Sequence, residues 1–162
     1  MSLQLVLLNQ LLRWQIKRRF RKNPDVQLLR PLMQQMEART SHLPADISVE
    51  DLSLGGVPAE RLSAEGASNG KAFLYIHGGG FVGGSPRTHR PLTWRFAKEI
   101  GIPVYAIDYR LAPEHPFPAG LDDCVAAYRA LLDKGYAAKS IIVGGDSAGG
   151  NLTLALALLS AL

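Results

Sequence analysis

This sequence of 162 residues lacks several common features, and each absence excludes a class of protein. It contains one cysteine, Cys124, so a disulfide framework within the chain is excluded. No apolar run reaches the roughly 18 residues that a membrane-spanning helix needs. Neither a G-K-[ST] phosphate loop nor a G-x-G-x-x-G motif with a following acidic partner occurs. Hydrophobic residues make up 47% of the chain, so we expect a packed core and not a disordered protein.

The positive charge is concentrated at one end of the chain. Residues 1–30 hold seven basic residues and one acid, whereas the remainder carries a net charge of −2. We interpret the basic segment as a surface helix, and contact of residues 1–22 with an anionic membrane stays open as an alternative. A nucleic-acid partner is not expected, because nothing else in the chain suggests a phosphate-tracking surface. The absence of a secretory signal and the unpaired Cys124 predict a cytoplasmic protein.

The first 70 residues divide into two regions. Residues 1–42 have a helical pattern with a break at Asn23–Asp25, because Pro24 disfavours helix at the residue before it. Glycines and prolines then punctuate two short segments, 47–54 and 59–63, which we predict to be the strands of a hairpin.

From residue 71 the chain alternates between short apolar runs and helical patterns. Three runs are predicted to be buried strands: 72–76, 102–107 and 140–143. Three helical patterns follow them in turn: 92–100 before Gly101, 121–132 before Gly135, and 151–162. This alternation predicts an α/β fold with a mostly parallel sheet, flanking helices and right-handed crossovers.

The segment Gly145–Gly149 fits the G-x-S-x-G pattern of a nucleophile elbow. It follows a predicted strand and opens a predicted helix, which is the setting that this chemistry needs. Glycines two residues on either side of Ser147 have a steric purpose, since larger side chains would collide with the neighbouring strand and helix. The alternative is a tight glycine turn that contains a serine by chance.

A second glycine motif, His77–Phe81, ends the first predicted core strand. Its glycines allow backbone N–H groups to approach a substrate closely, as in the oxyanion hole of acyl hydrolases. Such donors stabilise the negative oxygen of a tetrahedral intermediate.

Three motifs together, HGGGF at 77–81, DYRLAPEHPFPA at 108–119 and GDSAGG at 145–150, resemble the hormone-sensitive-lipase-like esterases of bacteria. The resemblance implies an α/β-hydrolase fold, a small-molecule ester as substrate, and no metal or cofactor. It implies an N-terminal helical cap segment at 1–42 and a core domain at 43–162. The site residues that it implies are Ser147 as nucleophile, Gly79, Gly80 and Ala148 as oxyanion donors with Gly78 as a further candidate, Asp146 in an orienting role, and Glu114, His115 and Pro118 in loop geometry.

The acid and base of a serine hydrolase are missing from their expected place. In this fold they follow the nucleophile, yet residues 148–162 contain no aspartate, glutamate or histidine. Of the histidines present (His42, His77, His89 and His115), His77 is the best placed to act as a base, since it is predicted near the strand ends, but the role that the resemblance implies for it is to shape the oxyanion loop. Asp108 and Asp123 are interpreted as caps or loop anchors. We therefore predict an incomplete hydrolase that is inactive alone and self-associates through its bare sheet edge.

Three functional hypotheses follow. The first is a carboxylic-ester hydrolase that forms an acyl-enzyme at Ser147. The second is a related acyl hydrolase acting on amides, lactones or carbamates, because the elbow and oxyanion loop do not discriminate among these substrates. The third is a non-catalytic binding protein on a hydrolase scaffold, which the missing base favours.

Overall fold

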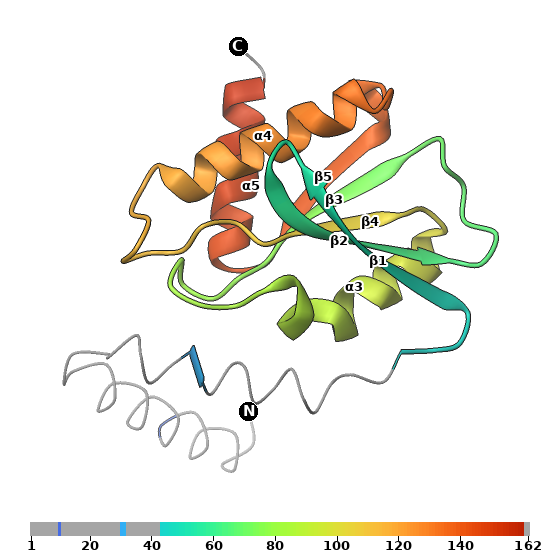
Figure 1. Cartoon of the computed structure of the whole chain (residues 1–162), viewed down its shortest axis with the longest axis horizontal. Helices are drawn as coiled ribbons and strands as arrows, with labels where there is room; N and C mark the ends of the chain where they lie inside the picture. The colour runs from blue at the N-terminus through green and yellow to red at the C-terminus, as the bar shows by residue number, and fades with distance from the viewer. Residues whose placement is uncertain (1–9, 11–29, 32–42, 161–162) are drawn as a thin grey trace.

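The computed structural model describes residues 10, 30–31 and 43–160, and within that part a five-stranded sheet carries three long helices (Figure 1). The elements are β1 (Ile47–Leu54), β2 (Val57–Ala64), β3 (Ala72–Ile76), α3 (Pro86–Ile100), β4 (Val104–Ile107), α4 (Ala119–Asp133), the short 3-10 helix η1 (Ala138–Ser140), β5 (Ile141–Gly145) and α5 (Ala148–Ser160). The predicted α/β class is confirmed.

The strand order β1-β2-β4-β3-β5 places the parallel part of the sheet at one side. β3 lies between β4 and β5 and runs parallel to both. β1 and β2 form the predicted antiparallel hairpin, and β2 pairs antiparallel with β4. The carboxyl ends of β3, β4 and β5 therefore meet at one edge, where ligands bind in sheets of this kind.

Two predicted boundaries differ from the structure. The strand predicted at 102–107 begins at Val104, because Pro103 has no N–H to donate to the ladder, although its carbonyl accepts a hydrogen bond from Phe73 N at 2.9 Å. The helix predicted from Asn151 begins at Ala148, since the N–H groups of Gly149 and Gly150 already bond to the carbonyl of Asp146. The helix thus starts directly after the serine.

The sheet separates two apolar cores. Figure 1 shows α4 and α5 on one face of the sheet and α3 on the other. Tyr105, Ile107 and Leu156 belong to the core under α4 and α5, whereas Phe73, Tyr75 and Val104 belong to the core under α3. Strands β3 and β4 are buried along their whole lengths, as expected for strands covered on both faces.

Most of the basic segment lies outside the described residues. The helical pattern predicted for 1–42, its break at Asn23–Asp25 and the membrane contact of residues 1–22 fall there almost entirely. Among the described residues, no helix has the length and apolar character needed to cross a membrane.

Candidate active site

Ser147 lies at the carboxyl edge of the sheet, between the end of β5 and the first residue of α5. Its φ of 50° is in the left-handed region, which for a residue other than glycine costs roughly 1–3 kcal/mol. The residue is exposed, whereas Ala148 and Gly149 directly after it are buried. A strained serine that is held out at the top of a strand–turn–helix is the geometry predicted for a nucleophile elbow.

The glycines beside Ser147 allow the elbow to pack against the end of β3. A Cβ at Gly149 would overlap the backbone carbonyl of Ile76, and a Cβ at Gly145 would meet the same carbonyl. The steric reason predicted for both glycines is therefore observed. Because the obstructing atoms are backbone, they cannot move aside as a flexible side chain could.

A second turn at this edge, Gly79–Gly83, is here called the glycine turn. The N–H groups of Val82 and Gly83 donate to the carbonyl of Gly79 at 3.2 and 3.1 Å. Positive φ angles of 126°, 65° and 65° at Gly79, Gly80 and Phe81 bend the chain sharply. Within the described part of the chain, the N–H groups of Gly79 and Gly80 have no hydrogen-bond acceptor, and neither has that of Ala148.

Gly78 differs from these three residues. Its N–H donates to Asp146 Oδ1 at 2.9 Å, and a Cβ at this position would lie within 3.0 Å of the Asp146 carbonyl oxygen. This hydrogen bond corrects the predicted donor set, because an N–H held by a carboxylate is not available to an oxyanion. Gly78 instead joins the glycine turn to the elbow.

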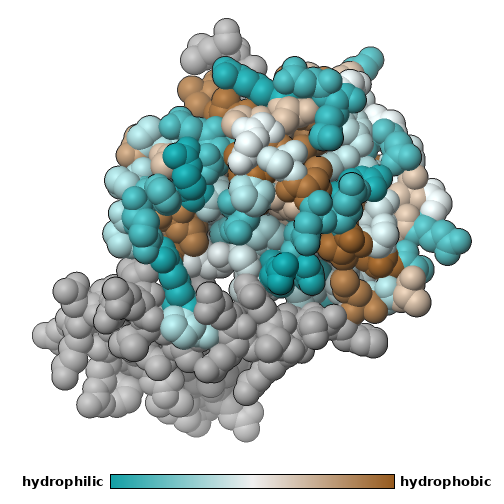
Figure 2. All heavy atoms as spheres, viewed as in Figure 1, coloured by the Kyte–Doolittle hydropathy of each residue, from teal (hydrophilic) through white to brown (hydrophobic). Residues whose placement is uncertain are grey.

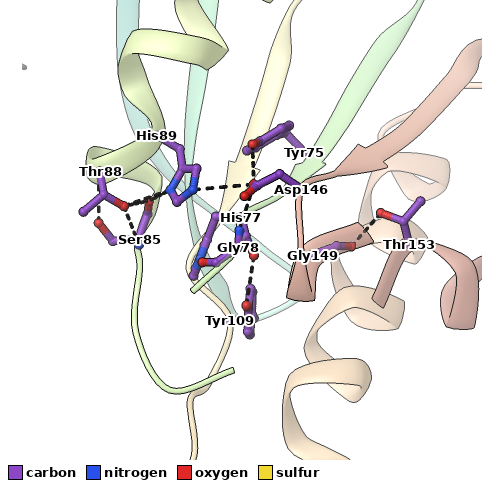
Figure 3. Close-up of polar contacts among 10 residues, drawn as sticks. All are labelled: Tyr75, His77, Gly78, Ser85, Thr88, His89, Tyr109, Asp146, Gly149 and Thr153. Atoms are coloured by element: carbon purple, nitrogen blue, oxygen red, sulfur yellow. Dashed lines mark hydrogen bonds and ion pairs between the residues drawn. The ribbon is translucent and has the colours of Figure 1, made fainter. Parts of the chain in front are cut away.

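The Asp146 carboxylate connects several elements at the edge (Figure 3). Its Oδ1 accepts a hydrogen bond from the Tyr75 hydroxyl at 2.7 Å, and His89 Nε2 lies 3.5 Å from the same oxygen. Burial raises the pKa of Asp146, but the hydrogen bond from Tyr75 and its other neighbours outweigh burial and hold the pKa below its usual value. Asp146 thus has the orienting contacts that the resemblance implied.

His77, the first residue of the glycine motif, is buried. Its ring stacks on Tyr109 with centroids 4.3 Å apart, and its Nδ1 lies 2.8 Å from the carbonyl of Gly78. Burial lowers the pKa of His77 to about 4, so the ring is neutral at pH 7. Its Nε2 has no hydrogen-bond partner among the described residues. These contacts agree with a structural role and give Ser147 no base.

The loop between β4 and α4 is anchored by charged pairs. Arg110 bonds to the Asp123 carboxylate through its backbone N–H at 2.8 Å and through its guanidinium, so Asp123 is a loop anchor as predicted. Arg30, from the N-terminal segment, forms a bidentate pair with Glu114 with both distances 2.7 Å. From the sequence, Arg30 is only one of the basic residues of the N-terminal segment, because nothing local indicates a partner 84 positions away.

An apolar cavity of about 170 Å³ borders the glycine turn and α5. Phe81 from the glycine turn and Asn151, one helical turn after Ser147, both line it. The other lining residues come from the loop after β4, the start of α4 and the inner face of α5: Tyr109, Arg110, Ala112, His115, Phe117, Gly120, Leu121, Leu152 and Ala155.

Comparison with known proteins identifies this arrangement. The alpha/beta hydrolase fold family matches residues 73–161, which include both glycine motifs and Ser147. The chain belongs to the α/β-hydrolase fold family. It is similar to an esterase from Acinetobacter venetianus, with 41% identity over 80% of this chain and 42% of that protein.

Solved structures narrow the likeness further. The structure of an esterase from the bacterial hormone-sensitive lipase family is 49% identical, with a TM-score of 0.76 over 82% of this chain and 45% of that one. The esterase EstE5, soaked with p-nitrophenyl butyrate, is 46% identical with a TM-score of 0.74 over 80% of this chain and 44% of that one. The predicted resemblance to hormone-sensitive-lipase-like esterases is confirmed. The chain spans about half the length of the relatives that it matches.

The described residues supply no base at Ser147. The Ser147 hydroxyl has no hydrogen-bond partner among them, and His89, which is the histidine beside the elbow, contacts Asp146 instead. The described residues also contain no cluster of three or more histidine, cysteine or acidic residues that could hold a metal ion. The observed site therefore consists of a strained, exposed serine beside backbone N–H groups that have no acceptor among the described residues.

Proposed function

We propose that this hydrolase provides the nucleophile and the oxyanion hole of a serine carboxylesterase site. One observation carries the proposal: Ser147 is exposed and strained at an elbow, next to N–H groups of the glycine turn and α5 that have no acceptor among the described residues. Preorganised donors of this kind stabilise the charge that develops on a carbonyl oxygen during acyl transfer.

In the proposed reaction, Ser147 Oγ attacks the ester carbonyl carbon and gives its proton to a base from outside residues 148–162, which passes that proton to the departing alcohol. The N–H groups of Gly79, Gly80 and Ala148 donate to the resulting oxyanion. When the tetrahedral intermediate collapses, the C–O bond to the alcohol breaks and the acyl group stays on Oγ. Water then attacks the acyl-enzyme and releases the acid.

The proton on Ser147 Oγ needs a base, and the described residues offer none within hydrogen-bond reach. Loss of the base in a serine hydrolase reduces turnover by about 10⁶-fold. We therefore expect the 162-residue chain alone to hydrolyse esters far more slowly than a complete hydrolase. The acid and the base would have to come from residues other than 148–160.

The expected substrate is a small ester with a short apolar group. A cavity of about 150 Å³ lined by apolar side chains takes up a molecule as large as benzene. The cavity beside the glycine turn has about 170 Å³ and mainly apolar walls. Its position next to Phe81 suits a short acyl or alcohol group better than a long chain.

A cytoplasmic location is proposed on the basis of the free, buried Cys124.

A fluorophosphonate probe tests the role of Ser147 directly. In a longer chain that turns over esters, Ser147 should be labelled, whereas Ser147→Ala should not be labelled and Ser140→Ala should behave like the parent. The 162-residue chain, which has no base at Ser147 among its described residues, should be labelled far more slowly than that longer chain. Equal labelling of the longer chain and its Ser147→Ala variant would rule out this nucleophile, and absence of labelling in the longer chain would favour the non-catalytic binding hypothesis.

Steady-state assays test the incomplete site and the substrate class. With p-nitrophenyl butyrate, the parent chain should show no turnover above Ser147→Ala. Turnover at the rate of a complete esterase would mean that a base is present in this chain. Rates on matched ester, amide, lactone and carbamate substrates, measured in a longer chain with turnover, would distinguish the ester hypothesis from its alternatives.

A further inference from the structure

Arg30 connects the N-terminal segment to two loops of the proposed active site. Its Nε donates to the carbonyl of Val82 at 2.7 Å, and its Nη2 donates to the carbonyl of Ala112 at 2.9 Å. The two Nη atoms also bind the Glu114 carboxylate, each at 2.7 Å. One guanidinium therefore bonds to the glycine turn and to the loop after β4 at the same time.

The contact with Val82 matters because the glycine turn is a strained structure. Phe81 has a φ of 65°, a left-handed conformation that residues other than glycine rarely adopt. Only two backbone hydrogen bonds form within the turn, and the carbonyl of Gly79 accepts both. From outside the turn, Ala112 N donates to the carbonyl of Phe81 at 2.9 Å, and Arg30 holds the next carbonyl. Hydrogen bonds from Ala112 and Arg30 thus hold the turn from outside.

The geometry requires arginine. The guanidinium presents five N–H donors in a planar fork, and here that fork serves two carbonyls and a bidentate carboxylate. Lysine has a single ammonium and could not satisfy all these acceptors together. The hydrogen bond from Arg30 lowers the pKa of Glu114 to about 2, so the pair is ionised throughout the neutral range.

We infer that Arg30 is a positioning residue for the oxyanion hole: it holds the glycine turn closed, with the N–H groups of Gly79 and Gly80 in fixed positions, through Val82 and through the Ala112–Glu114 loop. Arg30 touches no reacting atom in this role. The inference rests on the proposed function for its catalytic meaning, but the holding of the turn is a property of the fold.

Residue-resolved amide hydrogen exchange in the full chain tests the inference. In Arg30→Met, the amides of Val82, Gly83 and Ala112 should exchange about tenfold faster or more, while amides within β3 keep the parent's rate. Arg30→Lys should fall between Arg30→Met and the parent. Glu114→Gln should have a smaller effect than Arg30→Met, because it leaves the two bonds to carbonyls intact.

The matched control is Lys98→Met. It removes an ion pair of 2.8 Å with Asp46, which also joins a segment before β1 to the body but lies at the far end of α3 from the glycine turn. Its turn amides should exchange like the parent's. Unchanged exchange of Val82 and Gly83 in both Arg30 variants would overturn the inference, as would equal acceleration of all amides, which indicates only a general loss of stability.

Fluorophosphonate labelling of the same variants separates this inference from the proposed function. In a longer chain that is labelled at Ser147, slower labelling of Arg30→Met, with recovery in Arg30→Lys, is the expected consequence for the site. If such a longer chain is not labelled at Ser147, the proposed function fails, and the exchange experiment still decides whether Arg30 holds the turn.

Discussion

At the scale of single residues, Asp146 binds both the helix that follows Ser147 and the glycine motif. Its backbone carbonyl accepts hydrogen bonds from the first turn of α5, and its carboxylate accepts from Gly78 N. The residue before the nucleophile therefore links the start of α5 with the start of the glycine motif. Tyr75 completes the link from within β3, since it is buried and donates to the same oxygen.

Replacement of Tyr75 by phenylalanine tests this link. The hydroxyl donates to a charged carboxylate, and hydrogen bonds to charged groups contribute about 1.5–3 kcal/mol. We expect Tyr75→Phe to lower the free energy of unfolding by that amount, measured by urea denaturation. The control is Tyr136→Phe, which removes a hydrogen bond of 3.1 Å between two neutral hydroxyls and should cost about 1 kcal/mol or less. Equal losses in the two variants would contradict the linking role of Asp146.

The burial of His77 leads to a prediction of how the free energy of unfolding depends on pH. Its pKa falls from 6.5 to about 4 on folding, so below pH 6.5 the unfolded chain binds a proton that the folded chain excludes. Stability should therefore fall as the pH drops from 6.5 towards 4, by about 1.4 kcal/mol per unit of pKa difference. His77→Asn keeps a donor for the Gly78 carbonyl but does not titrate, and its urea midpoint should change less between pH 7 and pH 5. His115→Asn, which alters an exposed ring, should retain the parent's dependence.

The residues that sequence analysis missed share one physical property. Ser147, Gly79, Gly80 and Ala148 are proposed as site residues from short motifs, because such motifs encode the local backbone geometry that the proposed chemistry needs. The partners Arg30, Tyr75 and His89 act across large separations in sequence. Only the fold brings these side chains to the edge of the sheet, so no local pattern could indicate them.

At the scale of elements, α5 packs against the end of β3 at Gly149, where there is no room for a side chain. Gly149 is buried in the first turn of α5, where its Cα faces the Ile76 carbonyl without room for a methyl group. Gly150 follows it with more space, since a Cβ there would lie 3.3 Å from the Gly145 carbonyl oxygen. The two neighbouring glycines thus differ in what they require of the fold.

Alanine at each glycine measures this difference. We expect Gly149→Ala to lower the free energy of unfolding by about 3 kcal/mol or more, because the clash involves backbone that cannot yield locally. Gly150→Ala should change it by less than about 1 kcal/mol, since alanine favours helix and the contact is only tight. Thermal unfolding of both variants checks the ranking, and similar losses would show that the helix does not pack as described.

Element types were easier to predict from the sequence than element boundaries. The apolar runs of β3 and β4 are buried on both faces, and this leaves a clear signal. The start of α5 was predicted three residues late, because two of the three residues before Asn151, Gly149 and Gly150, have low helix propensity. In the structure, the Asp146 carbonyl accepts hydrogen bonds from two of these residues and overrides that propensity.

At the scale of the whole molecule, β5 and α5 form an apolar side without charge. Leu154 and Leu158 on α5 are 68% and 71% exposed, and Ile142 on the edge strand β5 is 45% exposed. Figure 2 shows apolar surface at the end of α5. From residue 141 to 162, Asp146 is the single charged side chain. Edge strands are normally protected by charges or by cover, and neither is present on this side within the described residues.

This side supports the proposal that the chain self-associates through its open sheet edge. We expect sedimentation velocity to show oligomers of the parent chain at micromolar concentration, because pairing of two edges would remove apolar surface from water at about 25 cal/mol per Å². Leu158→Lys and Ile142→Lys should each shift the distribution towards monomer. Ile100→Lys is the matched control, since Ile100 is equally exposed at 45% but lies on α3, across the sheet. If Ile100→Lys dissociates the oligomer and Leu158→Lys does not, association uses another face, and the β5 edge does not explain it.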